Sequence, residues 1–372
     1  MHVEPLLAAS TLTVSAGIVS ALVTAWAIAY ARRRNLIDHP GQRRSHRVPT
    51  PRGGGIGIVV ATLSCLCAPV LLTGIGLPLF PVAAFTFALM VVAAIGWYDD
   101  HHALSAAARF AVHTAAALIV LLPAWSEIGE VIAMRSSGAH ALGIIAAIIV
   151  VAVIAMVWSI NLHNFMDGLD GLLAMQAIFV LVSLATLCLW RGHPVLAWPM
   201  AIVVAAVLGF LPFNFPHARV FMGDVGSGAL GFLIAIACCW QIADSGTALA
   251  SGVIASSAFV TDTTLTLLLR FARGRRWYSA HREHLYQWLL RCGRSHAQIV
   301  AMYLAWNLLV VVPVLVWINR DANRMNSDSI STAGPTGIVG MLAIYALATV
   351  VWCVGKRQCL RLIRNRRHHA AA

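Results

Sequence analysis

The chain has 372 residues, of which 60% are hydrophobic and only 11% are charged, whereas a soluble domain carries about 25% charged residues. Its apolar runs recur too often and last too long for soluble core helices, which excludes a soluble enzyme, a disordered chain and a small disulfide scaffold. The formal charge of +12 does not indicate nucleic-acid binding, because no basic stretch alternates with stacking aromatic residues. We therefore expect an all-α, polytopic integral membrane protein in contact with membrane lipids.

Eleven segments are long and apolar enough to predict membrane spans of about 20 residues, and we expect 10 to 11 transmembrane helices. They lie near 7–30, 54–73, 78–97, 104–122, 141–160, 171–190, 194–213, 225–243, 247–269, 296–318 and 334–354. No basic region precedes the first, so it predicts a span rather than a cleaved signal peptide. We expect one transmembrane domain over 1–354 and a basic cytoplasmic tail over 355–372.

Arginine placement predicts which way the chain crosses the membrane. Alternate connecting segments together hold 21 of the 26 Lys and Arg residues. They are 31–52, 98–103, 161–170, 214–224, 270–295 and the tail from 355. Because basic residues are enriched in cytoplasmic loops, we expect a periplasmic N-terminus and a cytoplasmic C-terminus.

Five acidic residues fall at the cytoplasmic ends of these spans, although their positions were not used in assigning the sides. They are Asp99, Asp100, Asp167, Asp170 and Asp224. Adjacent carboxylates at a helix C-terminus repel each other and are disfavoured by the helix dipole, so a cation would offset both costs. Arg109 and His113 share a face of the next span, and we expect Arg109 to be buried beside the acids.

The run NLHNFMDGLDGLL is the most specific of the motifs. Asn161, Asn164, Asp167 and Asp170 lie within ten residues there. Asn side chains both donate and accept hydrogen bonds, which suits the edge of a base or sugar. In FMGDVGSGALG, Asp224 precedes a glycine-rich helix start that suits a divalent cation and phosphate.

The basic segment with HREHLYQ brings His281, Arg282 and His284 close to the membrane edge. Arg and His beside several acids predict phosphate binding; zinc binding by the two histidines stays open, although no third soft ligand is nearby. Asp262, inside the ninth span, is either a functional acid or a structural partner for Arg109.

Carboxylates, Asn, Arg and His at a membrane edge are the components of Mg²⁺-dependent phosphoryl transfer. A secondary transporter would place its acids at the midplane, between internal repeats that this sequence lacks. A phosphatase acting on a lipid phosphate, such as an undecaprenyl (pyro)phosphate phosphatase, is the nearer alternative, and it would release inorganic phosphate.

The strings SHRVPTPRGGGIGI, WYDD, NLHNFMDGLDGLL, FMGDVGSGALG and HREHLYQ, spread over about 30–310, closely resemble the polyprenyl-phosphate N-acetylhexosamine-1-phosphate transferases. That superfamily contains phospho-N-acetylmuramoyl-pentapeptide transferase and the initiating enzymes of O-antigen, enterobacterial common antigen and teichoic acid synthesis. The resemblance implies a bacterial inner-membrane enzyme with a cytoplasmic active site. It implies transfer of N-acetylhexosamine 1-phosphate from a UDP-N-acetylhexosamine to undecaprenyl phosphate, with Mg²⁺ (Mn²⁺ as an alternative) as cofactor. A homodimer is left open.

The resemblance also implies roles for individual residues. Asp99 and Asp100 match the catalytic acidic pair, and Asp224 matches the metal ligand. Asn164, Asp167, Asn214 and Phe221 match positions around the nucleotide, and we expect Asn161 and Asp170 of the same motif to lie at the nucleotide or sugar as well. The matches to diphosphate positions are His281, Arg282 and His284. Arg47 or Arg52 is expected near the lipid phosphate or the uridine, with Arg109 and Asp262 in support.

Two departures bear on the substrate. The muramoyl-pentapeptide enzymes carry a Lys three residues after the acidic pair, where this chain has Ala103, and a denser run of histidines. The spaced HREHLYQ motif resembles the O-antigen-initiating branch, whose donors include UDP-activated N-acetylfucosamine, N-acetylquinovosamine and N-acetylglucosamine.

Overall fold

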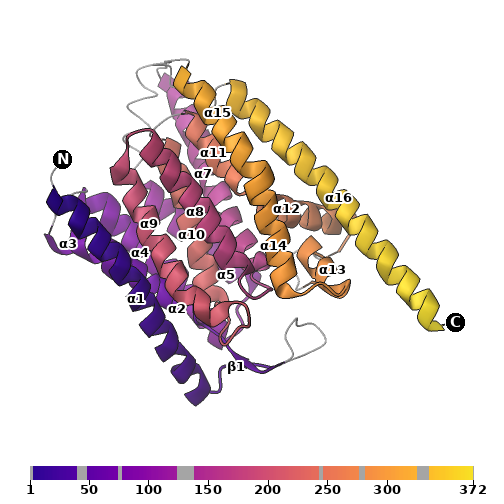
Figure 1. The fold of residues 1–372 in the computed structure, drawn as a ribbon. Helices are drawn as coiled ribbons and strands as arrows, with labels where there is room; N and C mark the ends of the chain where they lie inside the picture. The colour runs from indigo at the N-terminus through magenta and orange to yellow at the C-terminus, as the bar shows by residue number, and fades with distance from the viewer. Residues whose placement is uncertain are drawn as a thin grey trace.

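The protein is a bundle of membrane-spanning helices with one small two-stranded ribbon at its lower end (Figure 1). The computed structural model describes residues 3–39, 48–73, 78–123, 138–242, 246–275, 281–324 and 335–371. Within these ranges β1 (Ile37–Asp38) and β2 (Thr50–Pro51) pair antiparallel, with Ile37 opposite Pro51. The expected all-α fold is confirmed.

Each of the eleven predicted spans corresponds to a helix or to a short series of helices. The first six are α1 (Val3–Arg33), α2–η1–α3 (Ile56–Thr62, Leu63–Cys67, Ala68–Thr73), α4 (Leu79–His101), α5 (Ala106–Leu121), α7 (Gly138–Met166) and α8 (Leu172–Trp190). The other five are α9 (Pro194–Asn214), α10 (Gly223–Ile242), α11–α12 (Gly246–Ala255, Ser257–Ala272), α14–η2–α15 (His296–Trp306, Asn307–Val311, Val312–Arg324) and α16 (Pro335–Ala371).

Not every predicted span is a full-length straight helix. Eight of the described helices are long and apolar enough to cross a bilayer, and α11–α12 makes nine if this pair, bent by 69°, counts as one span. The apolar segments Ile56–Leu72 and Ala106–Leu121 are shorter than the roughly 20 residues of a full crossing. In Figure 1, α1 and α16 both run toward the lower end, as an odd number of passes requires.

Helix α10 forms the centre of the bundle and carries part of the acidic site. It packs against α4, α7 and α8. In its apolar membrane-spanning stretch 78% of the residues are buried, whereas the corresponding value for α1 is 22%. A Cβ at Gly231 would lie only 2.6 Å from the backbone oxygen of Ser159, and the Ser159 hydroxyl donates to Gly231 O at 2.7 Å. A small residue is therefore needed where α10 crosses α7.

The helices extend further at the lower end than the hydropathy pattern predicts. Helix α4 continues to His101, so Asp99 and Asp100 lie on its last turn, at a helix C-terminus as expected. Helix α7 continues to Met166 and carries Asn161 and Asn164. Helix α16 runs on to Ala371, so the predicted tail continues the last helix. The basic segment 270–295 contains an additional short helix, α13 (Leu285–Arg291).

Candidate active site

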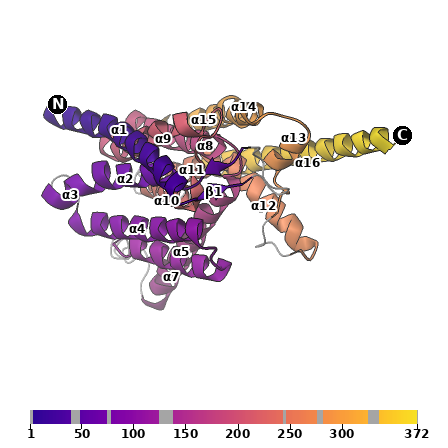
Figure 2. The same cartoon turned by 90° about the horizontal axis from the view of Figure 1, so that it is seen from below.

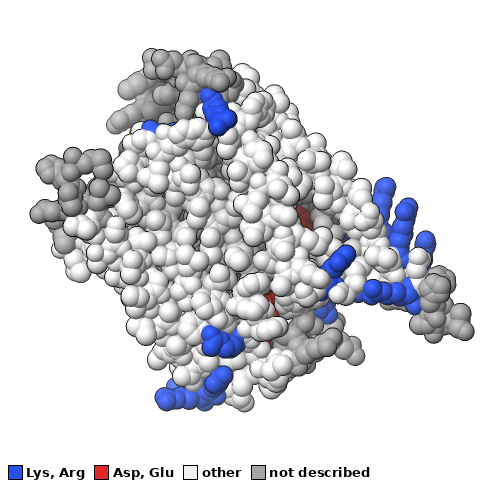
Figure 3. Space-filling model, viewed as in Figure 1, with Lys and Arg blue, Asp and Glu red and all other residues white. Residues whose placement is uncertain are grey.

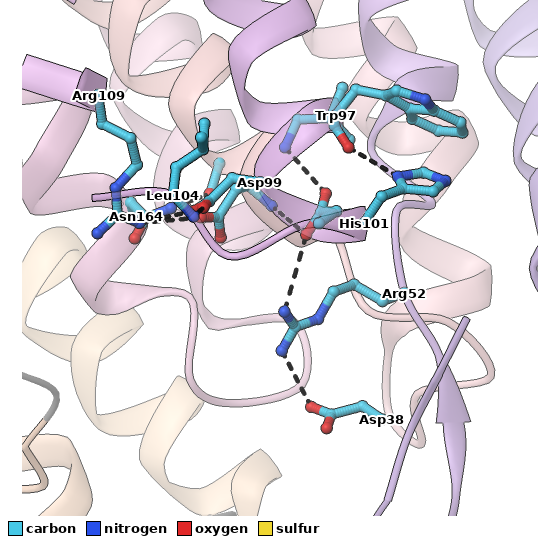
Figure 4. A network of polar contacts seen from close by, with 12 residues as sticks. Asp38, Arg52, Trp97, Asp99, His101, Leu104, Arg109 and Asn164 are labelled. Carbon is cyan, nitrogen blue, oxygen red and sulfur yellow. Dashed lines mark hydrogen bonds and ion pairs between the residues drawn. The ribbon is translucent and has the colours of Figure 1, made fainter. Parts of the chain in front are cut away.

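Three of the predicted acids meet at the lower end of the bundle because α4 and α10 pack together there. Asp99 and Asp100 end α4, Asp224 lies in the first turn of α10, and α5 contributes Arg109. Arg109 Nη1 donates to Asp99 Oδ2 at 2.7 Å and to Asp224 Oδ2 at 3.4 Å. Arg109 lies beside the acids as expected, which Figure 4 shows for Asp99, but it is only partly buried, with 32% of its side chain exposed.

Asp99 and Asp224 form the more accessible half of this acidic cluster. Their carboxyl groups are within hydrogen-bonding reach of each other, and the Leu104 backbone N–H donates to Asp99 Oδ1 at 2.6 Å. The Asp224 side chain keeps 28% of its surface exposed. Two carboxyl groups this close need a proton or a cation between them, and the single guanidinium of Arg109 balances only one charge.

Asp100 has a different environment from its neighbour. Its Oδ1 accepts the backbone N–H of Asp224 at 3.0 Å, and its Oδ2 accepts that of Val225 at 3.2 Å. Only 3% of the side chain is exposed. Asp100 therefore caps α10, where free N–H groups and the helix dipole favour an anion. The two adjacent acids have distinct tasks.

Arg52 links the acidic cluster to the two-stranded ribbon. Its guanidinium lies 3.9 Å from Asp100 Oδ1 and donates to Asp38 Oδ2 at 3.2 Å (Figure 4). Arg47, the other basic residue expected here, lies outside the described residues.

The glycine-rich motif after Arg52 is joined to the motif around Asp224 through backbone contacts. Gly54 N–H donates to Phe221 O at 2.9 Å, and Phe221 N–H donates to Pro51 O at 2.8 Å. Phe221, predicted at the nucleotide, thus holds two motifs together through its backbone. Gly223 follows with φ of +76°, and a Cβ there would lie 2.5 Å from Asp100 Oδ2.

Gly223→Ala is expected to lower activity strongly, because the new methyl group forces the Asp100 carboxylate off the N-terminus of α10. The positive φ adds a strain of about 1–2 kcal/mol. Gly143→Ala in α7 is the matched control, since an added Cβ there meets nothing within 4 Å. Turnover and thermal unfolding of the two variants would be compared; equal behaviour would contradict the tight approach at Gly223.

The end of α7 faces the same acidic cluster. Asn164 Nδ2 donates to Ser227 Oγ on α10 at 3.1 Å, and Asn164 also hydrogen-bonds Asp224. Burial, together with the negative charges of Asp224 and Asp100, raises the pKa of Asp167 well above its usual range. Asn161 instead donates to Val157 O of its own helix at 2.7 Å. Asn164 and Asp167 thus lie near the cluster, whereas Asn161 is tied back to its own helix.

Asp170 and Asn214 hold loops in place. Asp170 Oδ2 accepts the Ala218 backbone N–H at 3.2 Å and lies 3.1 Å from His296 Nδ1 at the start of α14. Asn214 Oδ1 accepts the Gly171 N–H at 2.8 Å, and its Nδ2 donates to Val220 O at 3.0 Å. Their predicted contacts with substrate stay predictions, but the structure gives both side chains partners within the protein.

The histidine motif packs against the end of α7 through α13. The hydroxyl of Tyr286 donates to Phe165 O at 3.1 Å, and the rings of His281 and His284 lie 4.8 Å apart, both near Phe165. The Nδ1 atoms of both histidines are buried and make no hydrogen bond within the described part of the chain. Two such nitrogens are suited to meet a bound polar ligand.

Burial, reinforced by the positive charges of His284 and Arg270, lowers the pKa of His281 to about 4, and burial also lowers the pKa of His284. At neutral pH both imidazoles are uncharged, so any positive charge at this motif comes from its arginines. Between about pH 4 and the ordinary His value of 6.5, the folded protein binds fewer protons than the unfolded chain.

Stability is therefore expected to fall as the pH drops through this window. His281→Asn should lose less stability than the wild type between pH 6.5 and 4, because the substituted side chain does not titrate there. Thermal unfolding in a neutral detergent would measure this. Identical pH dependence of the two proteins would contradict a neutral, buried His281.

Asp262 is bonded to other helices and not to Arg109, so that predicted alternative is wrong. It accepts the Leu285 backbone N–H at 2.7 Å, the Tyr303 hydroxyl at 2.8 Å and Trp352 Nε1 at 2.9 Å. Arg109 already pairs with Asp99 and Asp224. Asp262 therefore ties α12 to α13, α14 and α16, which fixes the helix that carries the histidine motif.

Sequence reasoning did not identify three charged partners of the site residues. Asp38 pairs with Arg52, His296 contacts Asp170, and Glu283 accepts from Arg270 and Arg275. Asp38 is the one acid in the basic segment 31–52, which is a usable signal. The position of His296 at a helix start gave no such signal.

Comparison with known proteins supports the grouping of these motifs. Residues 82–241 match the sequence profile of glycosyl transferase family 4. The chain is 30% identical over 342 residues to the decaprenyl-phosphate N-acetylglucosaminephosphotransferase of Mycolicibacterium smegmatis, covering 81% of this chain and 80% of that protein. The chain belongs to glycosyl transferase family 4.

More distant relatives include two other kinds of transferase. A probable undecaprenyl-phosphate N-acetylglucosaminyl 1-phosphate transferase of Bacillus subtilis is 25% identical, covering 76% of this chain and 79% of that protein. A phospho-N-acetylmuramoyl-pentapeptide-transferase of Leuconostoc mesenteroides is 31% identical over 55% of this chain and 67% of that protein. The superfamily assignment from the motifs is confirmed, and the protein is a multi-pass membrane transferase.

The acidic cluster of this family 4 protein has a donor set that suits a hard divalent cation. Asp99 and Asp224 present carboxylate oxygens that face each other across Arg109. Among the described residues, no three Asp, Glu, His or Cys side chains converge as a complete metal site. Mg²⁺ commonly takes one or two carboxylates and completes its shell with water and substrate phosphates, so two protein ligands fit.

Proposed function

We propose that this protein transfers N-acetylhexosamine 1-phosphate from a UDP-sugar to undecaprenyl phosphate, giving undecaprenyl-pyrophosphoryl-sugar and UMP. The observation that carries the proposal is the acidic cluster, in which Asp99 and Asp224 share Arg109 while Asp100 caps α10. The names of the relatives, which include N-acetylglucosamine 1-phosphate transferases acting on polyprenyl phosphates, support it. We further propose that it starts a cell-surface polysaccharide such as O-antigen.

In the proposed reaction, a phosphate oxygen of the lipid attacks the sugar-linked phosphorus of the UDP-sugar. The bond from that phosphorus to the bridging oxygen breaks, and UMP leaves with the electron pair. One phosphoanhydride replaces another, so the protein needs to position the phosphates and neutralise their charge rather than supply driving force.

The different surroundings of the two neighbouring acids support a division of labour. Asp99 is the better placed to orient the lipid phosphate or accept its proton, because its carboxyl group lies beside Asp224 and is less enclosed than that of Asp100, whose two oxygens cap α10. Arg109, which contacts two carboxylates of the cluster, holds them in a fixed geometry close to each other. Asp100 acts as a positioning residue.

We propose Mg²⁺ as cofactor, held by Asp224 and Asp99, with Mn²⁺ as an alternative. When bound, it would neutralise charge on the phosphates of both substrates. Asn164, which bonds Asp224 and Ser227, fixes the Asp224 carboxylate for this task. His281, whose Nδ1 atom is buried without a hydrogen bond among the described residues, is proposed to donate or accept a hydrogen bond at the diphosphate. We propose that His284, whose Nδ1 lies 3.9 Å from Asp262 Oδ1, supports it there.

The experiment that tests this function is incubation of purified protein with undecaprenyl phosphate, Mg²⁺ and a panel of UDP-sugars. UDP-N-acetylglucosamine heads the panel, followed by UDP-activated N-acetylfucosamine and N-acetylquinovosamine. Release of UMP together with a pyrophosphoryl-linked lipid is expected with one of them. Release of inorganic phosphate from the lipid without UMP would indicate a phosphatase instead.

We propose that the site faces the cytoplasm across a bacterial inner membrane. Lys and Arg side chains gather at the lower end of the visible face, around the end that carries the acids (Figure 3), as expected of a cytoplasmic side. Single cysteines placed at 98–103 in a cysteine-free background should resist a membrane-impermeant thiol reagent in intact spheroplasts and react after lysis. Labelling in intact spheroplasts would contradict this orientation.

A further inference from the structure

A second concentration of charge lies away from the acidic cluster, where α12, α13 and α16 meet. A hollow of about 910 Å³ is lined there by seven Arg or Lys side chains and a single acid, Glu283. Helices α12 and α16 diverge from the rest of the bundle on this side (Figure 2). These two helices therefore lie at the periphery of the bundle, where membrane lipid can reach them.

Cations outnumber carboxylates among the residues that line the basic hollow. Glu283 is shared by two of the cations, since Arg270 and Arg275 both donate to its Oε1. Lys356 on α16 is only 7% exposed, and its Nζ lies 4.3 Å from the centre of the Trp352 ring. No carboxylate of the described chain forms an ion pair with it. Asp262 and Glu283 attract this ammonium only from beyond ion-pair distance, and both carboxylates already accept from other groups. A bound anion would offset the remaining cost of burying the ammonium.

The acidic cluster and this basic hollow are lined by different residues. None of Asp99, Asp100 and Asp224 lines the hollow, and neither does any residue of the 161–170 motif. Of the predicted diphosphate residues, His281 and Arg282 do line it, whereas His284 is directed into the core beside Asp262. The hollow adjoins the proposed active site through α13 but has its own set of cations.

Helix α16 lines a second, apolar hollow in addition to the basic hollow. Met341, Tyr345 and Thr349 of α16 line a second hollow of about 520 Å³ together with Val253 of α11. Residues spaced by three or four share a helix face, and Lys356 follows Thr349 by about 10 Å along the axis. An apolar groove ending in a cluster of cations has the shape and charge of a site for an anionic lipid.

We propose that an anionic phospholipid of the membrane binds along α16, with its phosphate in the basic hollow and an acyl chain in the apolar one. This site goes beyond the transferase reaction, because its ligand is not consumed. Its occupant would act on the active site through α13. Trp352, which lines the hollow, donates to Asp262, and Asp262 also accepts the backbone N–H of Leu285 at the start of α13.

Lipid binding by purified protein in a neutral detergent tests this proposal without any assay of transfer. The probes are short-chain phosphatidylglycerol, phosphatidylcholine of the same chain length, and inorganic phosphate, followed by thermal shift and native mass spectrometry. Phosphatidylglycerol is expected to raise the unfolding temperature by several degrees and to stay bound, and phosphatidylcholine is not.

The double variant Arg273→Gln/Lys356→Gln should weaken phosphatidylglycerol binding about tenfold or more, because it removes two cations from the hollow. Arg361→Gln/Arg364→Gln is the matched control: it removes the same charge from exposed positions of α16 outside the hollow, and it should bind like the wild type. Each shift is measured against the same variant without lipid. If the double variant does not fold, the exposed Arg273→Gln alone replaces it.

Three outcomes would overturn the proposal. Equal stabilisation by inorganic phosphate would indicate a site for a small anion, and equal weakening in the control would indicate unspecific attraction by charge. Loss of UDP-sugar protection in Arg273→Gln/Lys356→Gln, with phosphatidylglycerol binding unchanged, would assign the hollow to the substrate. The first two outcomes do not depend on whether the proposed transfer reaction is correct; the third presupposes that a UDP-sugar stabilises the wild-type protein against thermal unfolding.

Discussion

Asp224→Asn is expected to abolish UMP release while the protein stays folded. The Asp224 carboxylate faces Asp99 and accepts from Arg109, so the amide removes one of the two carboxylates proposed to hold Mg²⁺. The backbone N–H of residue 224, which donates to Asp100, is unchanged by the substitution. The expected loss is at least about 10³-fold in kcat, the scale on which one preorganised charge acts in a closed site.

The control for Asp224→Asn is Asp321→Asn, which makes the same chemical change in α15. Figure 1 shows α15 at the opposite end of the bundle from the ribbon β1–β2. Purified variants would be compared by UMP release over a range of Mg²⁺ concentrations and by thermal unfolding. Near-normal turnover of Asp224→Asn would remove Asp224 from the proposed metal site. So would a loss of turnover in Asp224→Asn that a higher Mg²⁺ concentration does not restore, if the same Mg²⁺ concentration restores turnover in Asp99→Asn.

Replacing the two adjacent acids is expected to give different phenotypes. Asp99→Asn and Asp100→Asn should each lower kcat at least about 10²-fold, but only Asp100→Asn should also lower stability. The Asp100 carboxylate accepts two backbone N–H groups of α10, whereas an amide offers one acceptor oxygen. The loss corresponds to a weakened helix cap, about 1 kcal/mol.

Thermal unfolding and steady-state kinetics on the same preparations would separate the two effects. Asp99→Asn should unfold close to the wild-type temperature, since Arg109 retains its contact with Asp224. If Asp100→Asn were as stable as Asp99→Asn, the carboxylate would not be the cap of α10. If both variants kept wild-type turnover, neither acid would take part in the reaction.

Much of the site could be predicted because charge is scarce in this chain. An acid or an arginine inside a membrane protein is costly unless it has a partner or a task, so the amino-acid sequence alone was enough to group Asp99, Asp224 and Arg109. The side assignment required only the distribution of arginines. Hydropathy likewise located all eleven apolar segments, since each is bounded by polar or glycine- and proline-containing turns.

Contacts between helices distant in sequence could not be predicted in this way. No local pattern indicates that Asp100 caps α10, 124 residues later, or that Asp262 binds Trp352 of α16. The bend between α11 and α12 was also missed, because apolar character continues through it. Hydropathy reports where a segment is apolar, whereas the direction of a helix is set by the packing of its neighbours.

The unbroken course of α16 has a practical consequence for anyone shortening this protein. The helix has 37 residues, about 55 Å at 1.5 Å per residue, and the basic segment after residue 354 is part of this one continuous helix. Cutting the chain after residue 354 would remove Lys356, the carbonyl of Cys359 that Cys292 contacts, and the bond from Arg366 to Cys292. A label fused after Ala371 would leave these contacts intact and would report the tilt of α16 relative to the bilayer.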